Sequence, residues 1–280
     1  MDIIDRSRVK VAVIDMNNGT ANQGMRGIQE ILLRYREEHD IDLSFDIFDL
    51  RQKGEIPDLS YDIYISSGGP GSPFDGVGTT WENDFFNLLT ALENYNKQTD
   101  SAKKYAFLIC HSYQLGCRKF NVGEVIKRHS TAFGIFPVFL TDSGTSDLIY
   151  EGLGNPFYTV DSRDWQVVRV DESGDSPYTN VLALEKERPH VDLERCVMSV
   201  RFTNEIVGTQ FHPEADPVGM KMYLLRDDKK QAIIENHGME KYQDMLTSLD
   251  DTRKLQLTQT IILPRFITEA INALKQEAQL

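Results

Sequence analysis

The stretch KKYAFLICHSYQLGCRKF, residues 103–120, decides the fold, because a short apolar run passes directly into a segment with helical character. Residues 103–110 are mostly apolar, which is typical of a strand buried on both faces of a parallel sheet. Residues 111–120 predict a helix that starts where this strand ends. Cys110 stands at the junction, and functional sites of open α/β sheets form beyond such carboxyl ends of strands.

Strands and helices alternate ahead of this junction. Strands are predicted at 9–16, 44–50 and 61–67, and helices with one apolar face are predicted at 25–38 and 81–95. The resulting order of β-α-β-β-α-β favours a wound, mostly parallel sheet covered by helices.

The pattern changes in the rest of the chain. Short apolar runs separated by turn residues fill residues 130–212 and predict antiparallel strands. The tail has helical spacing, with Gly238 predicted to cap one helix and Pro264 predicted to lie in the first turn of the last helix. We therefore predict an α/β domain over residues 1–215 and a helical C-terminal extension over residues 216–280.

The composition excludes several classes of protein. The 280 residues include 30 Lys and Arg against 43 Asp and Glu, a formal net charge of −13, which disfavours binding to nucleic acid or an anionic membrane. The three cysteines include no CxxC pair, which argues against a disulfide framework and a zinc site. The few cysteines and an N-terminus without the apolar segment of a signal peptide lead us to expect a cytoplasmic protein. The sequence shows no Walker or Rossmann phosphate loop and no metal-like spacing of histidines, so we expect neither cofactor nor metal.

Cys110 and a later segment together suggest a thiol nucleophile. The N–H groups of the helix after Cys110 favour a thiolate and can stabilise an oxyanion, although a free cysteine is more often a buried packing residue. In EIVGTQFHPEAD, residues 205–216, His212 and Glu214 are two apart and point the same way on an extended chain. Such a carboxylate can orient an imidazole that takes the proton of a thiol. Alone, the HPE sequence is equally consistent with a polar turn at a strand end.

A glycine-rich loop completes the set of motifs. The stretch SSGGPGSP, residues 66–73, follows a predicted strand, and its glycines allow the backbone to approach a ligand closely. A backbone N–H in such a loop can point at an oxyanion. By itself the stretch would be an ordinary Gly/Pro turn.

In this order and spacing the three segments resemble the class I glutamine amidotransferase family, over roughly residues 8–215. The resemblance implies a flavodoxin-like three-layer αβα sandwich with a mostly parallel central sheet. It also implies a glutaminase-type enzyme that hydrolyses the side-chain amide of glutamine through a thioester on Cys110. His212 would be the general base and acid, and Glu214 would orient it.

The resemblance implies roles for further residues of the same segments. The backbone N–H groups of Gly69 and His111 would form the oxyanion hole. Gly68, Gly71 and Gln114 would contact the substrate.

Two features depart from the family pattern or extend it. The family usually has glycines two residues before and two residues after the nucleophile, where this chain has Leu108 and Ser112, and these larger residues crowd the turn. The stretch Ser162–Trp165 is expected to be a loop near the substrate, and its Arg163 is a candidate for holding a carboxylate, with a solvated loop as the simpler interpretation.

The resemblance also bears on the partners and on alternative functions of the protein. Family members usually pass ammonia to a synthetase, and no such module is visible here, so a separate synthetase partner or a homo-oligomer is possible. The apolar faces of the helical tail are expected to pack on the sheet or to form an oligomer or partner interface. The departures at Leu108 and Ser112 leave open a γ-glutamyl peptidase or amidase, or an acyltransferase resembling homoserine succinyltransferase. A non-catalytic binding module is a further alternative.

Overall fold

The computed structural model describes residues 8–98, 102–170, 180–189, 192, 194–249 and 252–277. The strands are β1 (Arg8–Asp15), β2 (Asp42–Asp49), β3 (Ile63–Ser66), β4 (Tyr105–Ile109), β5 (Glu124–Leu140), β6 (Phe157–Val168), β7 (Asn180–Glu185), β8 (Val197–Arg201) and β9 (Ile206–Thr209). The helices are α1 (Gln23–His39), α2 (Leu50–Lys53), α3 (Thr80–Gln98), α4 (His111–Phe120), α5 (Asp142–Ser146), the 3₁₀ helix η1 (Leu148–Tyr150), α6 (Pro217–Leu224), α7 (Asp227–Ser248) and α8 (Thr252–Glu277).

The strands form one sheet in the order β2-β1-β3-β4-β9-β8-β7-β5-β6. The pairs from β2 to β9 are parallel, in the flavodoxin-like order of a doubly wound sheet. The pairs from β9 to β6 are antiparallel. The predicted α/β fold, with parallel strands early in the chain and antiparallel strands in its middle, is confirmed.

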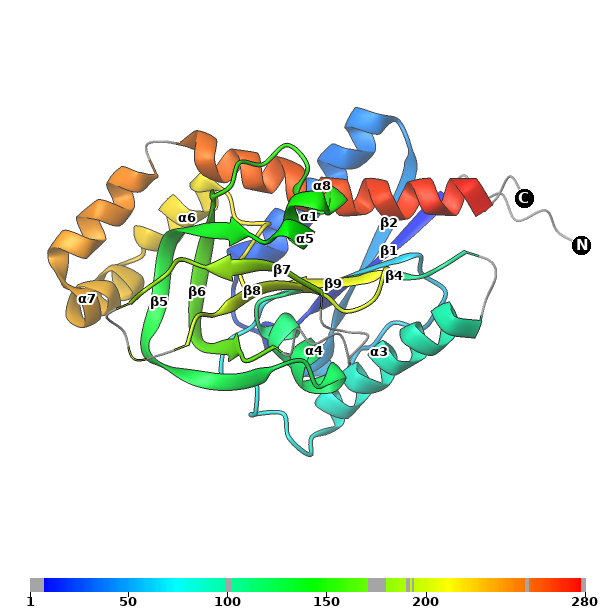
Figure 1. The fold of residues 1–280 in the computed structure, drawn as a ribbon, viewed down its shortest axis with the longest axis horizontal. Coiled ribbons are helices and arrows are strands. Elements are labelled where there is room, and N and C mark those ends of the chain that lie inside the picture. Colours follow the sequence, from blue (N-terminus) through cyan, green and yellow to red (C-terminus); the bar gives the residue numbers. More distant parts are fainter. Residues whose placement is uncertain are drawn as a thin grey trace, which may run out of the picture.

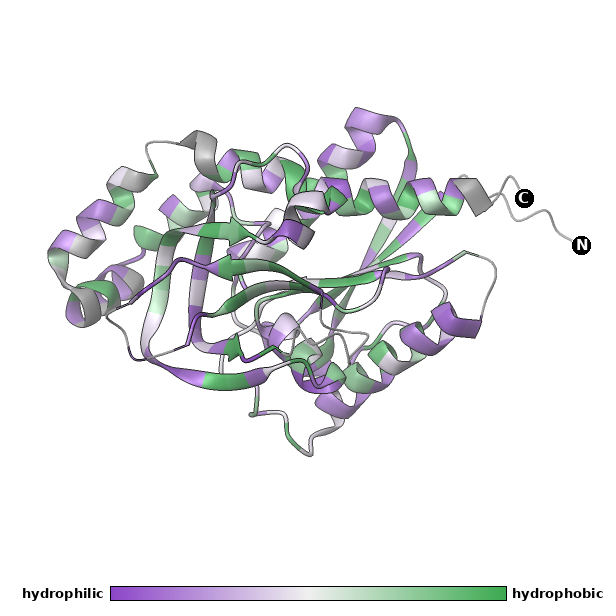
Figure 2. Ribbon diagram, in the orientation of Figure 1, coloured by the Kyte–Doolittle hydropathy of each residue, from purple (hydrophilic) through white to green (hydrophobic). Residues whose placement is uncertain are grey.

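Helices cover both faces of the parallel half, so the fold has three layers (Figure 1). On one face α1 and α8 pack on alternate residues of β1, β3 and β4, among them Val11, Ile65 and Phe107. On the other face α3 and α4 pack on the residues between these, such as Tyr64 and Leu108. Apolar residues accordingly run along the central strands in Figure 2, as expected for strands buried on both sides.

The last helix is part of the main hydrophobic core. Ile262, Leu263, Phe266 and Ile267 of α8 are all fully buried against the sheet. The prediction that Pro264 lies in the first turn of this helix is wrong, because α8 already starts at Thr252. The apolar stripe continues upstream of the proline, and the packing energy of that stripe outweighs the hydrogen bond that Pro264 cannot donate.

Helices α6 and α7 form a smaller cluster beside β5 and β6. Met220, Leu224 and Tyr242 are buried there together with Val160 of β6. Gly238 interrupts α7 with φ 85° and ψ 162°, so it ends one helical segment as predicted, but the chain then resumes the helix. Among the described residues, no helix has the length and apolar character needed to cross a membrane.

Candidate active site

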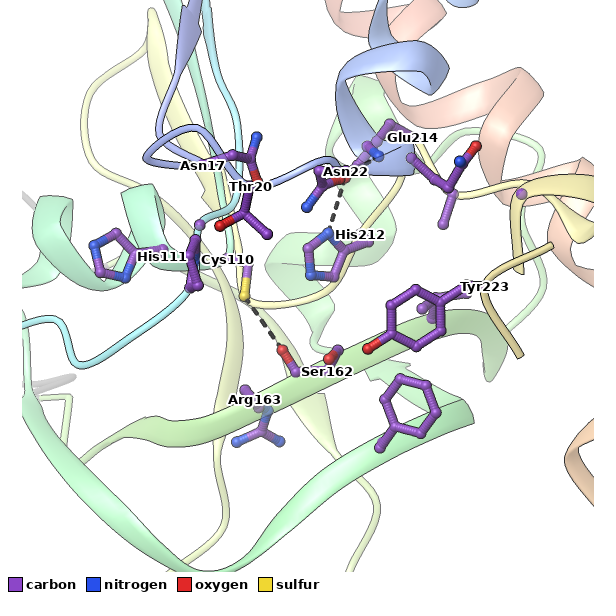
Figure 3. Close-up of a pocket in the computed structure, with 18 of the residues that line it drawn as sticks. Asn17, Thr20, Asn22, Cys110, His111, Ser162, Arg163, His212, Glu214 and Tyr223 are labelled. Atoms are coloured by element: carbon purple, nitrogen blue, oxygen red, sulfur yellow. Dashed lines mark hydrogen bonds and ion pairs between the residues drawn. The ribbon is translucent and has the colours of Figure 1, made fainter. Parts of the chain in front are cut away.

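The predicted motifs meet at the carboxyl ends of the parallel strands. Asn17 follows β1, Gly68 and Gly69 follow β3, Cys110 follows β4, and His212 follows β9. These ends share one edge of the sheet, and they line a cavity of about 420 Å³ (Figure 3). The cavity lining includes these predicted residues: Gly69, Gly71, Cys110, His111, Gln114, Arg163, His212 and Glu214.

Cys110 has a strained backbone. Its φ of 49° and ψ of −100° lie outside the regions that non-glycine residues normally occupy. Hydrogen bonds hold it there on both sides, since its N–H donates to Thr209 O at 2.7 Å and its carbonyl accepts from Gln114 N at 3.0 Å. Strain of this kind persists where the surrounding structure determines it, which is common at functional sites. The thiol is thereby presented at the N-terminus of α4.

The surrounding residues accommodate the larger side chains at the two glycine positions of the family. Gly116 of α4 leaves space for Leu108, because a Cβ on Gly116 would lie 2.7 Å from Leu108 Cδ1. The Ser112 hydroxyl is hydrogen-bonded to Ser66 Oγ at 2.7 Å and donates to Ser67 O at 2.6 Å. The strand-to-helix turn therefore forms with Leu108 and Ser112 in place.

His212 and Glu214 form the predicted pair. His212 Nδ1 lies 2.8 Å from Glu214 Oε1, and the Glu214 side chain is 1% exposed. The backbone of His212 is fixed to β6, because its N–H donates to Val160 O at 2.9 Å. Gly27 of α1 lies against the Glu214 carbonyl so closely that a Cβ would collide with it. Helix α1 thus packs tightly on the segment that carries the pair.

The imidazole lies next to the thiol. Burial disfavours a charge on His212, but the Glu214 carboxylate and the Cys110 thiol outweigh this and raise its pKa well above the ordinary value. Gly68 fits between the two side chains, since a Cβ there would be 2.8 Å from His212 Cε1 and 3.4 Å from Cys110 Cβ. The structure brings together a thiol, an imidazole and a carboxylate in the arrangement that a thiol nucleophile requires.

A pair of glutamines adjoins the sulfur. Gln210 Nε2 lies 3.7 Å from Cys110 Sγ, and Gln210 Oε1 accepts a hydrogen bond from Gln114 Nε2 at 3.1 Å. Gln114 therefore reaches the thiol through Gln210, which the sequence analysis did not identify. Its position two residues before His212 was the available signal, because residues two apart on an extended chain share a face.

The glycine-rich loop is held by an arginine from outside the motifs. Arg51 Nη1 donates to Met16 O at 3.1 Å and to Pro70 O at 2.7 Å, and the guanidinium stacks 5.0 Å from the Trp81 ring centroid. A Cβ on Gly69 would collide with Met16 O, so the loop requires glycine there. Arg51 was also missed by the sequence analysis, and its position at the end of β2, at the same sheet edge, was the only signal.

The His111 side chain is turned away from the sulfur (Figure 3). It is 2% exposed and its ring centroid lies 6.4 Å from that of Trp81. Burial, with a contribution from the charge of Arg51, lowers its pKa to about 3, so the imidazole is neutral. Only the backbone of His111 is therefore placed beside Cys110.

Arg163 lies in a different environment from the one expected. The stretch Ser162–Trp165 belongs to strand β6 and is not a loop. The Arg163 side chain is 1% exposed, and its guanidinium binds Asp161 at 2.9 Å and Glu185 at 3.3 Å. These two carboxylates pair with the guanidinium that was a candidate for holding a substrate carboxylate. Among the described residues, no group of three or more His, Cys, Asp or Glu side chains is arranged to hold a metal ion.

Comparisons with known proteins agree with this fold. Among solved structures, the chain is similar to a glutamine amidotransferase from Thermotoga maritima, with 14% identity, coverage of 94% of this chain and 98% of the other, and a TM-score of 0.68. It is also similar to a glutamine amido transferase from Methylobacillus flagellatus, with 11% identity, coverage of 94% and 96%, and a TM-score of 0.61. A third is the glutaminase domain of Trypanosoma brucei CTPS with bound acivicin, with 12% identity, coverage of 74% and 86%, and a TM-score of 0.55.

At these identities the structural neighbours establish the fold alone, and a search of curated proteins finds no match. The family model for class I glutamine amidotransferases is decisive, because it matches residues 25–232, about three quarters of the chain, and includes Cys110, His212 and Glu214. The chain belongs to the class I glutamine amidotransferase family.

Proposed function

We propose that this protein hydrolyses the side-chain amide of glutamine, or of a γ-glutamyl compound, through a thioester on Cys110. One observation carries the proposal: the strained Cys110 lies beside His212, whose Nδ1 is 2.8 Å from the buried Glu214 carboxylate. A merely packed thiol needs neither the strain nor the paired imidazole.

The residues would divide the chemistry as follows. His212 takes the proton of Cys110, and the thiolate attacks the γ-carbonyl carbon of the substrate. The imidazolium then protonates the leaving nitrogen, and ammonia departs from a γ-glutamyl thioester. A water molecule, deprotonated by His212, hydrolyses the thioester to release glutamate and restore the thiol. Glu214 fixes the orientation of the imidazole and stabilises its charged form, which agrees with the raised pKa of His212.

The backbone N–H groups of Gly69 and His111 are the proposed oxyanion hole. His111 is the first residue of α4, where N–H groups have no partner within the helix and the helix dipole favours negative charge. Gly69 lines the same cavity and belongs to the loop held by Arg51. Donors fixed in this way stabilise the oxyanion without reorganising during the reaction.

Where glutamine is the substrate, a synthetase partner that consumes the ammonia is part of the proposal, with a homo-oligomer as the alternative. The support is the similarity to the glutaminase domain of Trypanosoma brucei CTPS, a domain of a protein with further parts. All three cysteines are free thiols, which suits the cytoplasm as the proposed location.

The test compares alanine variants of two cysteines, Cys110 at the N-cap of α4 and Cys117 within α4. Cys110→Ala should abolish release of glutamate and ammonia from glutamine, and Cys117→Ala, which removes a fully buried packing thiol, should retain it. Both should give the circular dichroism spectrum of the wild type. Undiminished glutamine hydrolysis by Cys110→Ala would remove the proposal.

A further inference from the structure

Strand β6 runs along the cavity and contacts His212, Cys110 and Gln114 in turn. Val160 of β6 accepts the His212 N–H at 2.9 Å, Ser162 O lies 3.8 Å from Cys110 Sγ, and Trp165 O accepts from Gln114 Nε2 at 3.3 Å. Since a strand rises about 3.3 Å per residue, these contacts span roughly 16 Å along the strand. The thiol lies between a Gln114 end and a His212 end.

One wall of the cavity at the His212 end is apolar. It is formed by Phe133 of β5, Val160 of β6, and Met220 and Tyr223 of α6, while Asp216 and Arg226, which flank α6, also line the cavity. Phe133 pairs directly with Ser162 and so shares its face of the sheet, and its ring centroid lies 5.6 Å from that of Tyr223. We call the four apolar residues the apolar wall; Figure 3 shows Tyr223 on the same side of the cavity as His212.

The wall is supported by packing against the cluster behind it. Val160 and Met220 are buried, and all four residues pack into the cluster formed by α6, α7 and the ends of β5 and β6. The wall is therefore a preformed surface, as ligand pockets usually are.

The chemistry assigns an occupant to this surface. His212 donates its proton to the leaving nitrogen, so any group attached to that nitrogen lies at the His212 end of the cavity. Ammonia carries no such group and gains nothing from an apolar surface, whereas an apolar or aromatic substituent would be removed from water there. The glutamyl part of the substrate would occupy the Gln114 end.

We propose that the enzyme acts on γ-glutamyl amides whose nitrogen carries an apolar or aromatic group, and that the apolar wall binds this group. The inference rests on the proposed function and specifies its substrate class. In the reaction the sulfur–carbon bond forms and the carbon–nitrogen bond breaks, and the amine leaves with the His212 proton. Water then hydrolyses the thioester, so that glutamate and the free amine are the products.

The first experiment compares three compounds with the wild-type protein: L-glutamine, L-γ-glutamyl methylamide and L-γ-glutamyl benzylamide. The last two both release primary amines, but benzylamine is less basic than methylamine and leaves more readily. The Tyr223→Ala comparison below therefore separates binding of the substituent from leaving-group basicity. We expect kcat/KM for the benzylamide to exceed that for the methylamide by at least about tenfold, because a single methylene in an apolar pocket can already produce such a factor. Equal values, or a lower value for the benzylamide, would overturn the inference.

Variants of α6 test whether the preference for the benzylamide depends on the apolar wall. Tyr223→Ala should lower the ratio of the benzylamide kcat/KM to the methylamide kcat/KM by about tenfold. The matched control is Met222→Ala on the same helix, whose side chain is 53% exposed and lies outside the cavity, and it should leave both values unchanged. An unaltered ratio in Tyr223→Ala would place the substituent elsewhere and contradict the proposal. If that variant does not fold, equal values in the wild-type comparison still overturn the inference.

The two levels of the proposal fail in different ways. If glutamine and the methylamide are hydrolysed through Cys110 but the benzylamide is not preferred, the substrate inference is wrong and the proposed function stands. If none of the three compounds is turned over, the proposed function fails and the inference fails with it.

Discussion

Gly68→Ala tests whether the spacing between the thiol and the imidazole controls turnover. The new Cβ would lie 2.8 Å from His212 Cε1, whereas ordinary contacts between carbon atoms begin near 3.4 Å. The imidazole must therefore move by about 0.6 Å to reach this ordinary contact distance. A misplacement of about 1 Å can cost about 10²-fold in rate, so we expect kcat to fall by roughly 10-fold to 10²-fold.

The assay measures glutamate release at saturating glutamine, together with the thermal unfolding midpoint. Gly154→Ala is the matched control, because the nearest atom to its Cβ would be Pro156 O at an ordinary 3.5 Å, and it should keep the wild-type kcat. A Gly68→Ala variant with wild-type kcat and an unchanged unfolding midpoint would refute the reasoning, because the imidazole would then tolerate displacement.

Arg51→Gln removes the donor that holds Pro70 O and Met16 O, so the glycine-rich loop should lose its position. We then expect kcat to fall by about tenfold or more, with a smaller change in KM. Equal losses in Arg51→Gln and in an exposed control such as Arg8→Gln would argue against a positioning role. Glu214→Gln removes a charge that raises the pKa of His212, so the alkaline limb of the kcat–pH profile should move to lower pH, and a limb that stays in place would contradict the assignment. The raised pKa also means that His212 stabilises the fold below about pH 6.5 and that this contribution is lost as pH rises through the folded value, so urea titrations of Glu214→Gln should show a weaker pH dependence. Phe266→Ala empties a fully buried site of α8 and should lower the free energy of unfolding by about 3–5 kcal/mol, whereas a loss below about 1 kcal/mol would show that α8 is dispensable to the core.

The sequence was sufficient to predict the local features that each depend on a short pattern. The buried run before Cys110, the Gly/Pro loop after β3 and the HPE segment after β9 follow from adjacent residues, and the parallel topology then places them at one edge. The antiparallel strands in the middle were also predictable, because turn residues separate short apolar runs.

Features that depend on contacts between distant segments were not predictable. Arg163 looked solvated because its neighbours are polar, and only the fold places Asp161 and Glu185 against its guanidinium. The turn at Leu108 looked crowded because the pattern gave no sign that Gly116 provides the space. Arg51 lies far from the glycine-rich loop in sequence, and its contact with Pro70 exists only because β2 ends near β1 and β3.

Covalent trapping with 6-diazo-5-oxo-L-norleucine, a diazo-ketone analogue of glutamine, tests the central claim most directly. The measurement is the fragment mass spectrum of the tryptic peptide covering residues 105–118, which contains both Cys110 and Cys117. The thioester mechanism predicts one adduct, located on Cys110, whose formation is slowed by glutamine and lost in a His212→Ala variant. An adduct on Cys117, or full turnover of glutamine by protein that carries no adduct after prolonged incubation, would contradict it.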